Sequence, residues 1–348
     1  MKKLALLIIV LPFLVGLTNA QNLPTFSGLF FGDYYYVVNH DNTNPVNPTS
    51  TLGNAGKLEK SMGAFDYRRI YLTAAYNVAP DFLAQFRLES DPSASSLGGG
   101  NNTGKLSTMI KDAFIQWKNV TNGGNIIIGL QGTPQINMAE GIFGYRPIEK
   151  TIEDLHGISA SRDLGVSFNQ VFSDQFKAGL LIGNNSGNGV PTNKYKAAYL
   201  YLQFNPVKEL TILLNGQYND GPAGLNNRIV DIIANYANKE FSIGGQYFAN
   251  GLSTSAAGTL QRNGISLNGW VALTNNLHLV ARYDNFVPTT ASNKNTSYAT
   301  ATQSLIMAAL DWTVEKNVHI MPNIESVSFG NPGSTADLLA RATFYVSF

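Results

Sequence analysis

The chain has 348 residues, of which 44 % are hydrophobic and only 14 % are charged, and its formal net charge at pH 7 is +1. A charge so close to zero gives no support to a nucleic-acid partner, and the absence of cysteine excludes a disulfide framework. The length would suit two or three soluble domains, but large barrels form single domains of this size, and the composition favours one.

The first twenty residues have the pattern of a secretory signal peptide. Lys2 and Lys3 precede an apolar run, and Thr18 and Ala20 have the spacing that a signal peptidase reads. We therefore expect residues 1–20 to be a signal peptide and residues 21–348 to form the mature protein. The alternative is an N-terminal helix that stays in the membrane. Beyond this segment no stretch is long and apolar enough for a spanning helix.

From residue 26 onward, apolar and polar residues alternate along the chain. In "RIYLTAAYN", for example, Ile70 and Leu72 face one way while Arg69 and Thr73 face the other. We expect about sixteen such strands, each roughly ten residues long, which is the length that crosses a bilayer as a tilted strand. The segments begin near residues 26, 69, 82, 111, 125, 162, 175, 194, 209, 228, 240, 263, 276, 302, 318 and 338.

The connections between these segments alternate in length. Short ones such as "VAPD", "FSDQ", "NKE" and "VEKN" are separated by long polar ones such as "DPSASSLGGGNNTG" and "GNNSGNGVPTN". Tight turns at one end and long loops at the other are typical of an outer-membrane β-barrel, with the turns and both termini in the periplasm. The predicted fold class is an all-β, porin-like transmembrane antiparallel barrel, and the lipid bilayer of the bacterial outer membrane is its first partner.

The final stretch "RATFYVSF" predicts how the barrel closes. Every spanning sheet must pair all its backbone groups, so the last strand has to pair with the first. By alternation, Phe344, Val346 and Phe348 face lipid while Arg341 faces inward. The terminal phenylalanine on this pattern resembles the signal that the bacterial barrel assembly machinery reads. A final strand in a soluble β-sandwich is the alternative.

Eight aromatic residues at strand ends or on the outward face are expected to form interfacial girdles: Phe26, Tyr34, Tyr36, Trp117, Tyr247, Tyr283, Trp312 and Phe348.

Residues 26–172 resemble a known porin family. The motifs "FDYRRIYLTAAYNVAPDFLAQFRLESD", "KDAFIQWKN" and "RDLGVSF" occur in the order seen in the porins that include the phosphate-selective porins O and P. The resemblance implies a sixteen-stranded general or anion-preferring porin, usually a homotrimer, with a long third loop folded into the pore.

The third long connection, residues 133–161, is predicted to be that constriction loop. Its apolar residues Ile142, Phe143 and Ile148 would be out of place in a loop exposed to water. Its polar candidates are Glu140, Tyr145, Arg146 and Lys150, with Glu149, Glu153 and Asp154 as further acids. A short helix is expected near residues 148–155.

Strand alternation also gives the charges that line the lumen. The inward cations are Arg69, Arg87, Lys177, Arg262, Arg282 and Arg341, and the inward anions are Glu89, Asp112, Asp163, Asp231, Asp284, Asp311 and Glu325. Arg68, Arg162 and Arg228 fall on the outward face and are expected at solvated strand ends. Because the two signs nearly cancel, no dedicated phosphate ladder is evident, and the ion preference is expected to be mild.

The sequence gives little support to an enzyme. None of the four histidines has a metal-binding spacing, and no Ser-containing nucleophile elbow is present. His278 and His319 are expected near the headgroups, Tyr35 is a candidate for the solute path, and Glu153 with Asp154 offers only a weak calcium site. We therefore expect a passive channel for small hydrophilic solutes or ions, anion-preferring at most, without a cofactor or metal. The alternatives are a channel for a specific nutrient such as phosphate and a non-conducting structural barrel.

Overall fold

The structure is a computed structural model that describes residues 23–41, 59–91, 107–254, 258–289 and 301–348. The segment 1–20, predicted to be a signal peptide, lies outside these residues. Sixteen strands among the described residues form one closed antiparallel barrel, in which each strand pairs with its neighbours in sequence. The strands are β1 (Thr25–Asn39), β2 (Gly63–Ala79), β3 (Phe82–Asp91), β4 (Ser107–Thr121), β5 (Gly124–Gly132), β6 (Arg162–Ser173), β7 (Phe176–Gly183), β8 (Ala197–Phe204), β9 (Leu210–Asp220), β10 (Asn226–Ala237), β11 (Phe241–Thr254), β12 (Gly258–Thr274), β13 (Leu277–Val287), β14 (Gln303–Glu315), β15 (Val318–Phe329) and β16 (Asp337–Ser347).

The predicted barrel and its closure are confirmed. β16 pairs with β1 along its length, from Leu339 opposite Val37 to Ser347 opposite Leu29. The backbones of Gly28 and Phe348 then exchange two hydrogen bonds of 2.9 and 3.0 Å. A Cβ atom at Gly28 would lie 2.9 Å from the carbonyl oxygen of Tyr71 and 2.5 Å from the Phe348 ring, so this close approach of three strands favours glycine.

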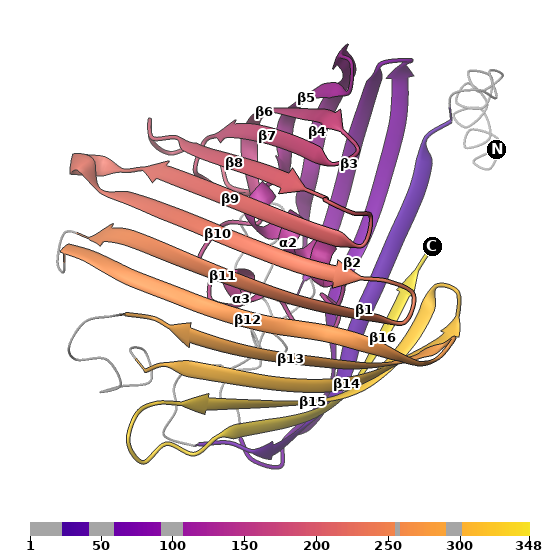
Figure 1. Ribbon diagram of the computed structural model, residues 1–348, viewed down its shortest axis with the longest axis vertical. Coiled ribbons are helices and arrows are strands. Elements are labelled where there is room, and N and C mark those ends of the chain that lie inside the picture. Colours follow the sequence, from indigo (N-terminus) through magenta and orange to yellow (C-terminus); the bar gives the residue numbers. More distant parts are fainter. Residues whose placement is uncertain (1–22, 42–58, 92–106, 255–257, 290–300) are drawn as a thin grey trace, which may run out of the picture.

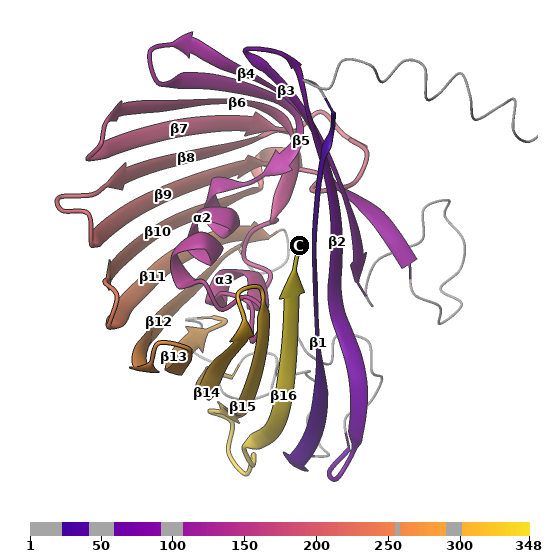
Figure 2. The same ribbon diagram turned by 90° about the vertical axis from the view of Figure 1, so that its right-hand side faces the viewer.

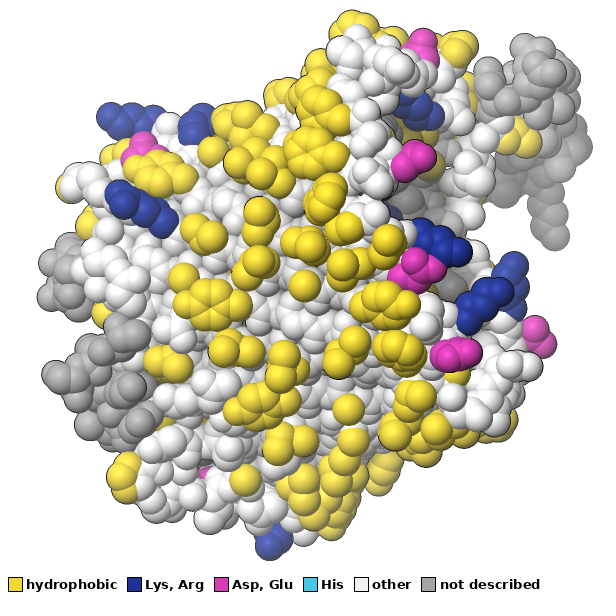
Figure 3. Space-filling model, in the orientation of Figure 1, with side chains coloured by type: hydrophobic (Ala, Val, Ile, Leu, Met, Phe, Trp, Pro, Cys, Tyr) yellow, Lys and Arg dark blue, Asp and Glu magenta, His cyan; other side chains and the backbone are white. Residues whose placement is uncertain are grey.

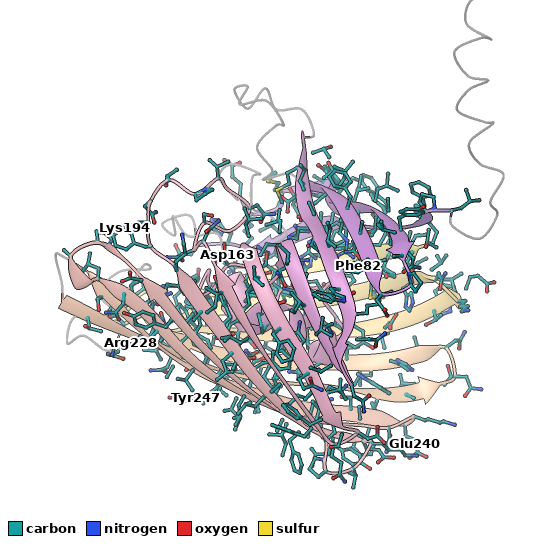
Figure 4. All side chains as sticks on the ribbon, turned by 90° about the horizontal axis from the view of Figure 1, so that it is seen from above. Phe82, Asp163, Lys194, Arg228, Glu240 and Tyr247 are labelled. Atoms are coloured by element: carbon teal, nitrogen blue, oxygen red, sulfur yellow. The ribbon has the colours of Figure 1, made fainter. Side chains whose placement is uncertain are left out.

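The two ends of the barrel differ as the sequence predicts. Short connections join β2 to β3, β4 to β5 and each later even strand to the next odd strand. Most connections that begin at odd strands are longer, but β9–β10 and β11–β12 have only five and three residues. Figure 1 shows the C-terminal end of the chain on the right, where the turns β8–β9 and β10–β11 also lie. In Figure 4, Lys194 and Arg228 lie at the loop end and Glu240 lies at the turn end.

The outer wall is covered by apolar side chains. On β12 the outward Ile265 and Leu267 are exposed while the inward Ser266 is buried. Figure 3 shows hydrophobic side chains spread over the middle of the wall, with most charged side chains near its two margins. A closed sheet with this surface satisfies its backbone internally and presents an apolar belt to a bilayer.

Aromatic residues mark both margins of this belt. The eight predicted girdle residues are all exposed, and Tyr247 points away from the barrel in Figure 4. At the turn end, outward rings stack in pairs, with centroids 5.5 Å apart for Phe82 and Trp117 and 5.3 Å apart for Phe172 and Phe176. These positions match the aromatic girdles of membrane barrels.

Two β-bulges change the direction of adjacent charged residues. Between β1 and β2 the register moves from Phe31 opposite Arg69 to Gly32 opposite Tyr67, so Arg68 is an extra residue. Arg68 is 5 % exposed and bonds to groups inside the barrel, so its predicted outward, solvated position was wrong. A second bulge between β3 and β4 turns Lys111 inward beside Asp112. A bulge inserts one residue and therefore reverses the alternation locally.

Candidate functional site

Residues 133–161, here called the inner segment, run through the interior of the barrel between β5 and β6. They contain the helices α2 (Pro134–Phe143) and α3 (Ile152–Leu155), which Figure 2 shows inside the ring of strands. Pro134 occupies the first turn of α2, and Gly144 ends it with a φ of 78°, which glycine adopts freely. α3 falls within the expected residues 148–155, whereas α2 was not predicted from the sequence. None of the helices among the described residues is long and apolar enough to cross a membrane.

One side of the inner segment packs against apolar residues of the wall. Phe143 and Ile148 belong to a buried cluster with Val280, Met307 and Val327. Two further clusters join the segment to the wall: Ile152 and Ile158 pack with Ile229, Phe248 and Phe286, and Ala139 packs with Leu213 and Ile233. Burying each large side chain contributes about 1.5–3 kcal/mol. These contacts explain why apolar residues point into an otherwise polar lumen.

Two arginines of the wall bind the backbone of the inner segment. Arg68 Nη1 donates to the carbonyl oxygens of Pro147 (2.8 Å) and Ile148 (2.6 Å), and Arg282 Nη1 donates to that of Lys150 (2.5 Å). Arg68 also lies 3.6 Å from the Glu149 carboxylate. A guanidinium with several fixed acceptors holds the backbone in one geometry.

Asp33 on β1 connects this anchor to the closing seam of the barrel. Its carboxylate is fully buried and lies 3.5 Å from Arg68 and 3.8 Å from Arg341 of β16. The hydroxyl of Thr343, also on β16, donates to Asp33, and Arg341 pairs with Glu325. The seam and the inner segment therefore share one network of buried charges.

At α3, two buried carboxyl groups share amide partners. Gln135 donates to both Glu153 oxygens at 3.0 Å, and the Gln246 amide reaches Glu153 at 3.3 Å and Asp231 at 3.2 Å. Burial, and then the Asp231 carboxylate, raise the pKa of Glu153 above its ordinary value of 4.5. The carboxyl is therefore favoured in its neutral form.

His156, which follows α3, is also held neutral. Its ring stacks on Phe286 with centroids 3.9 Å apart. Burial, reinforced by the Arg282 cation, lowers the pKa of His156 to about 3. This histidine packs as a neutral ring, as many buried histidines do.

On their inward faces, strands β2, β3, β4 and β6 carry a set of ion pairs that we call the charged wall. Arg69 pairs with Glu89 and with Asp91 (2.6 Å), and Lys111 pairs with Glu89 (2.8 Å). Arg87 and Arg162 both bind Asp112, at 3.2 and 2.6 Å.

One cation of the charged wall, Arg87, lies in front of the carboxylates. The Arg87 side chain is 28 % exposed, whereas Asp112 and Glu89 are 5 % and 0 % exposed. The surface that meets water is therefore more positive than the balanced count of charges suggests.

The polar face of the inner segment carries both signs of charge. Arg146 Nε donates to Glu140 at 2.8 Å and its guanidinium lies 3.7 Å from Asp154, which also lies 4.0 Å from Lys150. These side chains are partly exposed. Ion pairs at partly solvated positions contribute little to stability. They do fix the positions at which these charged groups face the lumen.

A cavity of about 700 Å³ lies between these surfaces, toward the turn end of the barrel. Arg87, Arg146 and Arg162 line it on one side. The rings of Trp270, His278, His319 and Tyr345, here called the ring wall, line it from β12, β13, β15 and β16. A solute that passes the inner segment at this end meets both surfaces.

The residues predicted to line the pore fall into three groups. Arg87, Glu140, Tyr145 and Arg146 line the cavity. Lys177 and Arg262 face inward elsewhere and are partly exposed, as is Lys150. The remaining five candidates point inward but are buried in ion pairs behind the surface: Arg69, Arg282, Arg341, Glu89 and Asp112.

For several residues of the site, the prediction from the sequence was wrong or gave no role. His278 and His319 line the cavity, so their expected place near the headgroups was wrong. Arg162 is buried and binds Asp112, so its predicted outward position was also wrong. Tyr35 points inward but is 2 % exposed and packs with Val37 and Leu339, so it does not line the cavity.

The signals for the two bulges, at Arg68 and at Lys111, were visible in the sequence. Arg68–Arg69 and Lys111–Asp112 are adjacent charges within strands, and an outward Arg or Lys at the membrane midplane costs about 2–4 kcal/mol. Such a pair indicates a bulge. Among the described residues no group of three His, Asp or Glu side chains could hold a metal ion.

No protein-family model matches the sequence, and no curated protein matches it. Solved structures do resemble it. An anion-selective porin from Comamonas acidovorans aligns with a TM-score of 0.64 at 13 % identity over 94 % of this chain and 100 % of its own.

Two other similar structures are outer-membrane proteins. The outer membrane channel DcaP of Acinetobacter baumannii aligns with a TM-score of 0.66 at 12 % identity over 95 % of this chain and 99 % of its own. A loop-deletion mutant of OmpT, an outer membrane protein of Vibrio cholerae, aligns with a TM-score of 0.66 at 14 % identity over 94 % of this chain and 99 % of its own. One OmpT structure is of a trimer form. The chain therefore has the sixteen-stranded fold of bacterial porins and is a membrane-spanning barrel of the outer-membrane type.

Proposed function

We propose that this protein is a diffusion channel of the bacterial outer membrane, through which small hydrophilic solutes and ions pass down their gradients. The observation that carries the proposal is the cavity beside the inner segment. The inner segment packs against one arc of the wall and leaves this polar, charged space open along the charged wall. A sixteen-stranded barrel is wide enough to contain both.

The channel is proposed to prefer anions mildly. The exposed guanidinium of Arg87 faces the lumen while its partner carboxylate lies behind it. The carboxylates on the polar face of the inner segment oppose this preference, since Glu140 and Asp154 are as exposed as Arg146. Selectivity follows the sign of the charges that an ion meets, so the expected preference is weak.

The decisive experiment is reconstitution of the purified protein into planar bilayers. We expect stable ohmic current steps in KCl and a small reversal potential of the anion-preferring sign in a KCl gradient. Strong anion selectivity would favour the alternative of a phosphate or other nutrient channel, to which the resemblance to the phosphate-selective porins O and P points. Bilayers that show no steps although the barrel is inserted would overturn the proposal in favour of a structural barrel.

Assembly is proposed to depend on the end of β16, where Phe344, Val346 and Phe348 would be read by the barrel assembly machinery. Phe348 is 72 % exposed on the outer wall. Deletion of Phe348 should therefore reduce the amount of folded barrel in the membrane far more than it changes the conductance of the barrels that form. Unchanged insertion would contradict this role. A homotrimer is proposed with it, supported by the trimer form of one similar structure.

A further inference from the structure

The ring wall departs from the usual lining of a barrel. Its four rings project into the lumen, where lipid cannot cover them. Inward positions on the neighbouring strands β9 to β11 carry amides and hydroxyls such as Asn215 and Gln246, beside apolar residues such as Leu213 and Phe248 that the inner segment covers. A polar interior is the rule for such barrels, so aromatic rings that border the lumen call for an explanation.

The rings are held in fixed orientations. Trp270 and His278 stack with centroids 4.6 Å apart and planes 13° apart, and His319 meets Tyr345 edge to face at 5.6 Å. Trp270 and Tyr345 also pack against the buried cluster formed with the inner segment. Each therefore has one face supported by protein while the residue still lines the cavity.

Hydrogen bonds fix His319 and leave other donors free. Asp311 accepts from Tyr145 at 3.3 Å and pairs with His319 Nδ1 at 2.7 Å, so the Nε2 atom of His319 remains for a ligand. Within the described part of the chain, neither the Trp270 indole N–H nor the His278 ring nitrogens have a protein partner. The ring wall thus offers stacking faces together with unused polar atoms.

Three arginines line the same cavity, together with the carboxylates of Glu140 and Asp311. Arg87 and Arg146 reach it from β3 and from the inner segment, and Arg162 reaches it from β6. A guanidinium binds a carboxylate with charge-assisted hydrogen bonds, while an aromatic ring stacks on a planar solute. Together the two surfaces match a small anion that carries a planar ring.

We propose that the cavity is a retention site for small aromatic carboxylates, whose ring rests on the ring wall while the carboxylate faces Arg87 and Arg146. This inference names a solute class for the proposed channel and rests on that function. A site that holds such a solute briefly raises its local concentration in the lumen and slows the flow of other ions while it is occupied.

The test compares benzoate with acetate as blockers of single-channel current in KCl. The two anions carry the same charge and differ in the ring. We expect benzoate to reduce the current at concentrations roughly two- to tenfold lower than acetate, as one stacking contact would give. Benzyl alcohol, which has the ring without the charge, should block less than benzoate.

Matched variants assign the effect to the ring wall. Trp270→Leu should remove the difference between benzoate and acetate, and Tyr345→Leu is a second variant should the first fail to form channels. Trp312→Leu, which changes an exposed tryptophan on the outer wall, should retain the difference.

The outcomes separate this inference from the proposed function. Channels that conduct in KCl but respond equally to benzoate and acetate would overturn the retention site alone, as would a Trp270→Leu channel that keeps the difference. Equal block by benzyl alcohol and benzoate would overturn the role of the cations. The absence of any channel in KCl would overturn the proposed function itself.

Discussion

The two sides of the lumen hold the inner segment by different interactions. On β1 and β2, buried charges bind its backbone, and the key arginine, Arg68, faces inward because of a bulge. On β9 to β15 the side chains alternate between the inward and outward faces, with no bulge at the contacts. Apolar side chains such as Leu213, Phe248 and Met307 pack there against the inner segment. Apolar packing buries surface area and stabilises the inner segment, while the arginines fix its position. Substitutions on the two sides can therefore distinguish effects on the stability of the barrel from effects on the width of the pore.

The largest effect is expected at Arg68. Arg68→Met would leave Asp33 and Glu149 without their shared cation and free the carbonyls of Pro147 and Ile148. Removal of one partner from a buried ion pair costs about 3–5 kcal/mol. We expect a loss of this size in the free energy of unfolding in detergent, together with a less uniform single-channel conductance.

Arg228→Met is the matched control for this prediction. Arg228 is exposed at the loop end and lies over the Tyr218 ring at 5.8 Å. A surface change of this kind should stay within about 0.5 kcal/mol of the wild type. If the two variants unfolded alike, Arg68 would not be an anchor.

The apolar side should respond more weakly to a small change. Ile152→Val removes one methyl group from a fully buried site and should cost about 0.5–1.5 kcal/mol in denaturant unfolding. The same substitution at Ile306, which is 60 % exposed on the outer wall, provides the comparison. A stable Ile152→Val protein with an altered conductance would show that packing, too, sets the bore.

Glu153 should make stability depend on pH. Because its pKa in the folded protein lies above 4.5, the folded state holds the proton more tightly than the unfolded state. Stability is then greatest below about pH 4.5 and falls as the pH rises through the raised pKa. Glu153→Gln should match the wild type at low pH and exceed it at high pH in thermal unfolding experiments.

Ile152→Val is the control for the pH effect, since it changes the neighbouring side chain of α3 and removes no titratable group. It should leave the slope of stability against pH as in the wild type. A Glu153→Gln protein that retained the full slope would place the titrating group elsewhere.

The smallest effect is expected for Arg87, whose change should alter selectivity rather than stability. Arg87→Ser removes the most exposed cation of the charged wall and should move the reversal potential in a KCl gradient toward zero. Lys208→Ser, a change at a side chain that is 89 % exposed at a turn, should leave the reversal potential unchanged. An unchanged potential in Arg87→Ser would mean that ions do not pass along the charged wall.

The strands and the closure of the barrel could be predicted because alternation is a property of each strand by itself. The inward direction of Arg282 and Arg341 follows from the same rule. Their burial does not, because it depends on the register between strands, which brings Arg341 to Glu325, and on the docking of the inner segment. The sequence of one strand does not show which residue of another strand will be the partner in an ion pair.

The ring wall shows the same limit for the candidate site. Alternation places Trp270 on the inward face, but nothing local shows that His278, His319 and Tyr345 border the same cavity. That cavity exists because the inner segment turns at Gly144 and leaves the turn end open. The place of a residue around the barrel and the path of a long connection both depend on the complete fold.

The contacts of Asp33 suggest an order of events in biogenesis. Its carboxylate is neutralised by Arg68, which grips the inner segment, and by Arg341 and Thr343, which arrive only with the last strand. Until β16 pairs with β1, Asp33 lacks two of these partners, so the buried network that positions Arg68 and the inner segment is incomplete. The width of the pore would thus be set in the same step that closes the barrel. Neither a partly assembled barrel nor a closed barrel with an unrestricted pore would then persist.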